Sequence, residues 1–174
     1  MYTLDDKLFC VLHSCDESLH SSRLTCYMYL YELIKCDFAF KYTISNGGIK
    51  SRAVDEYTGK LIALGLLQNK NGILKLTSNG DIRYSEFLMF ADEWEVFYTI
   101  KRSVDALSDN ELTFVVLVDI LVMDVLNKYG ADGLRSKEDF IRGTLTKLSS
   151  EYSETNFDNA IGLLSRIRGL AKHE

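Results

Sequence analysis

Hydrophobic positions near the start of the chain recur every three or four residues, as they do on one face of a helix. This spacing predicts a first helix over residues 4–15, and a second that begins at Ser21 or Ser22 and runs through Ile34. The period then changes to two. In residues 38–44 large apolar side chains alternate with Ala39, Lys41 and Thr43, which predicts a half-buried β-strand.

Two glycine-containing segments flank the next predicted helix. Residues 45–48 read Ser-Asn-Gly-Gly and predict a loop, after which we expect Ser51 to cap a third helix that Gly65 ends. Residues 68–72 contain an Asn-Gly pair between two apolar runs, which predicts a β-hairpin. Helix, helix, strand, helix and hairpin follow in the order of a winged helix-turn-helix, so we assign residues 1–80 to a winged-helix domain.

The rest of the chain has helical periodicity throughout. We expect a helical stretch over about residues 81–106, and then a strongly apolar helix that a Ser108–Glu111 capping box opens and Gly130 ends. Two further helices are expected, one opened by Ser136 with Asp139 and one from Ser153 to about Leu170. Residues 81–174 are therefore predicted to form a helical C-terminal domain that packs on the first. The predicted fold class is mainly α with a small β-sheet.

The composition is that of a globular protein. Of 174 residues, 47% are hydrophobic and 26% are charged, and none is proline. Charges interrupt every apolar run before it could cross a membrane, and Asp5 and Asp6 stand where a secretory signal would be basic and then apolar. We expect a cytoplasmic protein without contact to a membrane.

Charge is unevenly distributed along the chain. The net charge is −5, and the whole excess lies after residue 90. Residues 41–75 have a local charge of +4, because six cations face only Asp55 and Glu56. The six are Lys41, Lys50, Arg52, Lys60, Lys70 and Lys75. They are candidate contacts to duplex DNA or to a protein partner, and an ordinary solvated face is the alternative.

Metal and cofactor chemistry has little support in the sequence. The four cysteines are Cys10, Cys15, Cys26 and Cys36. Their separations do not match the short paired spacing of zinc ligands, so we interpret them as free thiols. Asp92 and Glu95 would share one helix face, but no third ligand is evident near them. We therefore expect no metal and no cofactor.

Catalytic motifs are equally scarce. The chain has no Walker A, GxSxG, HExxH or dinucleotide-binding fingerprint. Arg168 and His173 have an Arg-x4-His spacing that resembles the motif of HEPN ribonucleases. However, Gly169 follows the arginine and His173 is the penultimate residue, where chains are commonly disordered. We interpret this spacing as accidental and expect no catalytic residue and no enzyme.

Three segments of the predicted winged helix carry a family resemblance. They are residues 37–42 (Asp-Phe-Ala-Phe-Lys-Tyr), 61–67 (Leu-Ile-Ala-Leu-Gly-Leu-Leu) and 74–80 (Leu-Lys-Leu-Thr-Ser-Asn-Gly). Together they resemble the YwgA-like and Panacea (SocA-like) phage-associated winged-helix proteins. Residues 148–161 are similar to the helical tail of the YwgA-like proteins. Those families usually have Tyr-Gly-Pro-Tyr-Ser before the third helix, and this chain has residues 43–51 in its place.

The chain is also similar to the winged-helix middle components of Lamassu-type defence systems, which accompany an SMC- or ABC-type ATPase and an effector. Both resemblances imply antiphage or anti-plasmid defence. The implied partners are an SMC/ABC-type ATPase and an effector nuclease or toxin, bound by a non-enzymatic adaptor subunit. The alternative is a DNA-binding transcriptional regulator or antitoxin of a mobile element. The negative net charge favours docking to protein over independent DNA binding.

Overall fold

Helices make up most of the protein, and short strands form two small antiparallel sheets. The computed structural model describes residues 7–8, 11–12, 19–45, 48–87 and 93–170, and only the backbone at residues 86, 87, 93 and 94. Residues 7–8 and 11–12 are helical; the remainder of the helix predicted over 4–15 lies outside the described residues. The elements that follow are β1 (Leu19–His20), α2 (Ser21–Lys35), β2 (Thr43–Ser45), β3 (Gly48–Lys50), α3 (Arg52–Ala63), β4 (Leu67–Lys70), β5 (Ile73–Leu76), α4 (Ser78–Phe87), α5 (Glu93–Val104), α6 (Asp109–Ser136), α7 (Glu138–Leu148) and α8 (Glu154–Leu170). The predicted fold class, mainly α with a small β-sheet, is confirmed.

The larger sheet has the strand order β1-β5-β4. Its β4–β5 hairpin turns at Asn71 and Gly72, which both have positive φ (56° and 83°), and the Asn69 side-chain oxygen accepts the Gly72 N–H at 2.9 Å. These dihedral angles suit the tight right-handed twist of a two-residue hairpin. The hairpin predicted over residues 68–72 is therefore confirmed. We call β4, β5 and their turn the wing.

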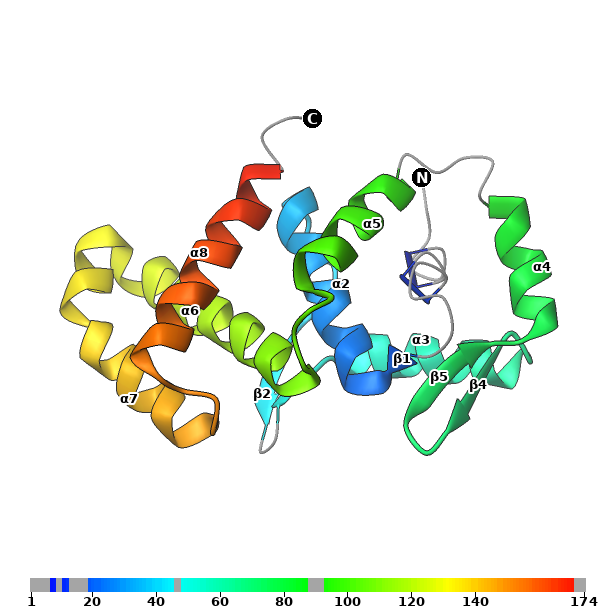
Figure 1. The fold of residues 1–174 in the computed structure, drawn as a ribbon, viewed down its shortest axis with the longest axis horizontal. Helices are drawn as coiled ribbons and strands as arrows, with labels where there is room; N and C mark the ends of the chain where they lie inside the picture. Colours follow the sequence, from blue (N-terminus) through cyan, green and yellow to red (C-terminus); the bar gives the residue numbers. More distant parts are fainter. Residues whose placement is uncertain (1–6, 9–10, 13–18, 46–47, 88–92, 171–174) are drawn as a thin grey trace.

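Helix α2 is the centre of the core. Every residue from Leu24 to Ile34 is buried, and α2 packs against α5, α6 and α8. Figure 1 shows these helices around α2, with α7 at one end of an elongated molecule and the wing with α4 at the other. Among the described residues the core therefore continues from the first half of the chain into the second as one cluster.

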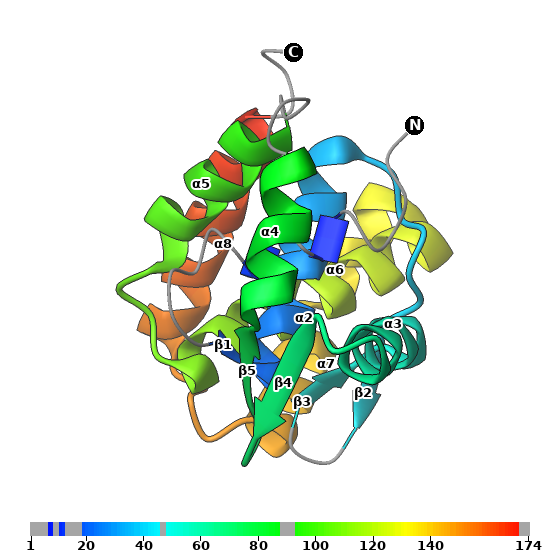
Figure 2. The same cartoon turned by 90° about the vertical axis from the view of Figure 1, so that its right-hand side faces the viewer.

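The wing and α3 lie next to each other at one end of the molecule (Figure 2). In chain order, β1 precedes α2, α3 precedes the wing, and β1 pairs with β5. This connectivity is the one expected of a winged helix, apart from the β2–β3 hairpin between α2 and α3. The winged-helix assignment and the domain boundary at residue 80 stay predictions.

Several helix ends lie where local signals predict them. Gly65 has φ 70° and ends α3, with its N–H donated to the Ile62 carbonyl and the Leu66 N–H to the Leu61 carbonyl, the two bonds of a Schellman motif. The Ser108–Glu111 capping box forms in both directions, and Ser153 accepts the Asn156 N–H at 3.0 Å at the start of α8. Gly130 interrupts α6 with non-helical dihedral angles, after which helical turns resume as far as Ser136.

Two other predicted caps are wrong, and a third lacks its side-chain hydrogen bond. The N-cap of α2 is His20, because pairing of β1 with β5 holds that residue extended and the Ser21 N–H donates to the Gly72 carbonyl. Lys137 precedes α7, since the Ser136 hydroxyl donates instead to the Gly133 carbonyl. Ser51 precedes α3 as predicted, but its buried hydroxyl accepts no cap hydrogen bond.

The remaining boundaries also differ from the prediction. The stretch expected over residues 81–106 forms two helices, and α4 begins at Ser78 because the Thr77 hydroxyl accepts the Gly80 N–H at 3.1 Å. At the ends of the loop expected at 45–48, Ser45 of β2 pairs with Gly48 of β3, and residues 46–47 lie outside the described residues.

The strand predicted over residues 38–44 forms only at its end, in β2. The buried Glu32 carboxylate accepts the N–H groups of Ala39 (2.8 Å) and Phe40 (3.0 Å), which a strand would use in its ladder. Phe40 is buried against Tyr42 and against Tyr57 of α3, whereas Phe38 of the same alternating set is half exposed. The alternation from Phe40 onward therefore reflects burial on one side without strand pairing.

Candidate interaction surface

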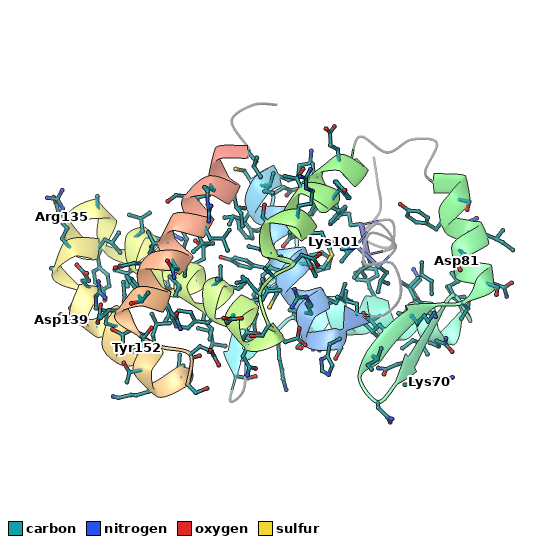
Figure 3. The ribbon with its side chains drawn as sticks, in the orientation of Figure 1. Lys70, Asp81, Lys101, Arg135, Asp139 and Tyr152 are labelled. Atoms are coloured by element: carbon teal, nitrogen blue, oxygen red, sulfur yellow. The ribbon has the colours of Figure 1, made fainter. Side chains whose placement is uncertain are left out.

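The six cations proposed from the sequence are all exposed. Lys41 precedes β2, Lys50 ends β3, Arg52 and Lys60 lie on α3, and Lys70 and Lys75 lie on the wing. Figure 3 shows Lys70 at the end of the wing, pointing away from the body of the molecule. Arg52, Lys60, Lys70 and Lys75 therefore lie on α3 and the wing, at one end of the protein. Lys41 and Lys50 flank the β2–β3 hairpin nearer the middle, where β3 contacts α2 and α6 (Figure 1).

The wing has a cationic outer face. In its register Gln68 lies opposite Lys75 and Lys70 opposite Ile73, and residues opposite each other point to the same side of a sheet. Leu67 and Leu74 point to the other side and are buried. The outer face thus combines two lysines with an amide and a 45% exposed isoleucine, Ile73, and has no carboxylate of its own.

The exposed face of α3 is electrically neutral. Arg52 and Lys60 are matched by Asp55 and Glu56, and the Arg52 guanidinium pairs with the Glu56 carboxylate at 2.7 Å. Their side chains are 92% and 62% exposed, so this pair adds little to stability.

The other end of α3 is apolar. Leu64 is 60% exposed and Ile62 is 37% exposed, and both lie at the C-terminus of this helix. The start of α4 packs close by, since Gly80 lies directly against the Leu66 carbonyl. We call Ile62 and Leu64 the apolar edge.

Two buried carboxylates form a polar network that was not predicted from the sequence. Glu32 has no exposed surface, and besides its two backbone donors it accepts the Tyr42 hydroxyl at 2.8 Å. Asp119 is 1% exposed and accepts the Tyr29 hydroxyl at 2.7 Å and the Arg168 guanidinium. The Tyr29 and Tyr42 rings meet edge-on at 5.0 Å, so the two halves of the network touch.

Burial dominates the electrostatics of this network. It raises the pKa of both the Glu32 and the Asp119 carboxyl groups, against the opposing effect of their hydrogen-bond donors. The network joins α2, the segment before β2, α6 and α8. The sequence does contain a signal for this network, because Glu32 and Asp119 each lie inside a long apolar run. A carboxylate that is buried with such a run requires a hydrogen-bonding or charged partner.

The structure adds no support for the ribonuclease-like spacing or for a metal site at the cysteines or at Asp92 and Glu95. Arg168 is paired with Asp119, and His173 lies outside the described residues, as do Cys10, Cys15 and Asp92 and the side chains of Glu93 and Trp94. Cys26 is buried, which raises the pKa of its thiol to about 12. Cys36 is exposed. The residues described by the structure contain no group of three side chains able to hold a metal ion.

Comparisons of the chain with protein families, curated proteins and solved structures find no match. The family resemblances drawn from the sequence therefore stay predictions. None of the described helices is both long and apolar enough to cross a membrane.

Proposed function

We propose that the protein is a non-enzymatic adaptor whose winged helix docks onto a larger protein through α3 and the apolar edge. One observation carries this proposal: the helix that a DNA-reading winged helix would present to the major groove is neutral and ends in exposed aliphatic side chains. A helix that reads bases favours cations and amides at its N-terminus, but here Arg52 is paired with Glu56. Exposed aliphatic residues beside mixed charges suit a protein interface.

The partner class comes from the sequence resemblances. They point to a bacterial antiphage or anti-plasmid complex in the cytoplasm, in which the adaptor binds an SMC/ABC-type ATPase and its effector nuclease or toxin. That the adaptor has no activity of its own is a prediction from the absence of catalytic motifs in the sequence.

Docking through the apolar edge is tested by co-expression of the tagged chain with the products of its neighbouring genes. The wild type is expected to recover a neighbour, and Leu64→Asp to lower that recovery about tenfold, which corresponds to about 1.4 kcal/mol of binding free energy. A buried carboxylate without a partner at the interface is the physical reason. Recovery is measured by quantitative mass spectrometry after affinity purification.

Phe140→Asp is the matched comparison, because Phe140 on α7 is also 60% exposed but lies at the opposite end of the molecule. Loss of the partner in Leu64→Asp alone assigns docking to α3, and loss in both variants adds α7 to the docking surface. A wild-type chain that purifies alone with its neighbours present contradicts the adaptor function.

Binding of duplex DNA is the second candidate function, as in a transcriptional regulator or antitoxin. The cationic outer face of the wing favours it, since Lys70 and Lys75 have no carboxylate beside them on that face. Such contacts are made to phosphates and depend strongly on salt.

If the protein binds DNA, it retards a duplex at low salt, and Lys70→Glu with Lys75→Glu abolishes that retardation. Lys50→Glu with Arg52→Glu is expected to do the same through the start of α3. Arg135→Glu with Lys147→Glu reverses the same charge on exposed residues of the helical half and is expected to leave binding unchanged. Absence of retardation by the wild type at low salt removes this candidate.

A further inference from the structure

Two adjoining cavities form a groove between the two halves of the chain. The first has a volume of about 330 Å³ and lies between the start of α2, β3 and α3. The second, of about 190 Å³, lies between the start of α6 and the segment that joins α7 to α8. Ser22, Gly48 and Thr113 line both cavities, so the groove is continuous past the β2–β3 hairpin. The larger cavity alone is within the size range of protein ligand sites.

The lining of the groove suits the backbone of an extended peptide. Hydroxyl groups follow its length, with Ser21 and Thr25 at one end, Thr113 in the middle, and Ser149 and Ser150 at the other. Thr113 already donates to the Asp109 carbonyl and the buried Thr25 to the Ser21 carbonyl, so the Thr113 hydroxyl retains a lone pair that can accept a peptide N–H. The exposed Ser150 hydroxyl can both donate and accept.

The second cavity is suited to a cationic side chain. Asp109 and Glu151 bring two carboxylates to it without a lysine or arginine in its lining, and Leu117 and Leu148 supply apolar surface for an aliphatic stem. Arg23 already pairs with Oδ1 of Asp109 at 2.9 Å, whereas the Glu151 carboxylate has no ion pair with any residue that the structure describes. At the other end of the groove Lys50 and Asp55 balance each other.

We propose that this groove binds an extended segment of the partner protein, with an arginine or lysine of that segment in the second cavity. The inference rests on the proposed adaptor function, and it adds a second, separate contact site to α3. Because α2 and β3 line one end and α6 with the α7–α8 segment the other, an occupant would contact both halves of the chain.

The probe is a blocked Gly-Ser-Arg-Ser-Gly peptide, titrated into the ¹⁵N-labelled full chain and followed by amide chemical shifts. Saturable shifts are expected at Asn110, Thr113 and the amides of residues 149–151. The same peptide with glutamate in place of arginine is expected to cause none. The proposal is overturned if the arginine peptide shifts amides near exposed carboxylates all over the protein, or if both peptides cause equal shifts.

Two variants separate charge from space. Glu151→Lys reverses the charge of the cavity and Ser150→Trp fills it, and each is expected to weaken peptide binding about tenfold or more. Asp158→Lys makes the same charge change at an exposed position on α8 outside the groove lining and is expected to leave binding unchanged. Equal weakening by Asp158→Lys identifies general electrostatic attraction and overturns the groove site.

The same variants in the co-expression assay keep the two proposals distinct. If Glu151→Lys and Ser150→Trp recover the neighbour as well as wild type does, while Leu64→Asp loses it, the groove fails and the adaptor function stands. If the arginine peptide binds in the groove but the wild type recovers no neighbour, the adaptor function fails instead.

Discussion

Glu32→Ala is expected to lower the free energy of unfolding by about 3 kcal/mol. The substitution removes the acceptor for the buried Phe40 N–H, for the Ala39 N–H and for the Tyr42 hydroxyl, and each such group costs roughly 1–3 kcal/mol when it is left without a partner. Alanine also removes the cost of burying a carboxylate, and this gain offsets part of the lost stability. Urea denaturation followed by circular dichroism measures the change.

Glu32→Gln is the matched control, because its amide oxygen can still accept both backbone N–H groups. We expect it to cost less than half as much as Glu32→Ala. A Glu32→Ala protein as stable as the wild type would show that the segment before β2 is held by its aromatic contacts alone.

The pair of proteins also tests the pKa of Glu32. Burial raises that pKa in the folded protein above its ordinary value of 4.5, so the folded chain binds more protons than the unfolded chain just above that pH. The contribution of Glu32 to stability is therefore fully present below pH 4.5 and declines as the pH rises through the folded pKa. The wild type is expected to lose stability relative to Glu32→Gln as the pH rises. A wild type that gains stability relative to Glu32→Gln over the same pH range contradicts a raised pKa of Glu32.

The features predicted correctly from the sequence depend on neighbours three to five residues away. The turn at Asn71 and Gly72, the Schellman motif at Gly65 and the Ser108–Glu111 box are each complete within one short segment. Their physical causes, positive φ at glycine and hydroxyl caps on free N–H groups, operate before any tertiary contact forms.

The strand predicted over 38–44 was wrong for the opposite reason. Its alternation is real, but Phe40 is buried against Tyr42 and Tyr57, at ring centroid distances of 6.5 and 6.4 Å, while the backbone donors bond to Glu32. A pattern of period two shows only that one side of the segment is buried. The backbone N–H groups can then donate to a side chain on another element instead of to a second strand.

The candidate surface was partly predictable. Exposure of six lysines and arginines follows from the cost of burying a charge, and the Arg52–Glu56 pair could have been read from its i, i+4 spacing. The apolar edge could not. Leu64 fits the buried stripe of Val54 and Leu61, yet it is the C-cap of α3, and the chain turns at Gly65 so that Leu64 faces solvent.

Arg168→Leu is expected to destabilise the protein by about 3 kcal/mol, because it leaves the buried Asp119 carboxylate with only the Tyr29 hydroxyl as a side-chain partner among the described residues. The full cost of breaking a buried pair is about 3–5 kcal/mol, and the Arg168 side chain is 37% exposed, which places this pair at the lower end. Urea denaturation of the purified variants measures the cost.

The second change that tests this reasoning is Asp119→Asn. An asparagine oxygen still accepts the Tyr29 hydroxyl but carries no charge that needs a cation, so Arg168→Leu with Asp119→Asn is expected to recover most of the lost stability. If the double variant is no more stable than Arg168→Leu, packing of the arginine stem between α6 and α8 accounts for the loss, and the ion pair does not. A different outcome would be that the wild type cleaves RNA, whereas Arg168→Leu is as stable as the wild type but does not cleave it. Arg168 would then belong to an active site, and the protein would be an enzyme.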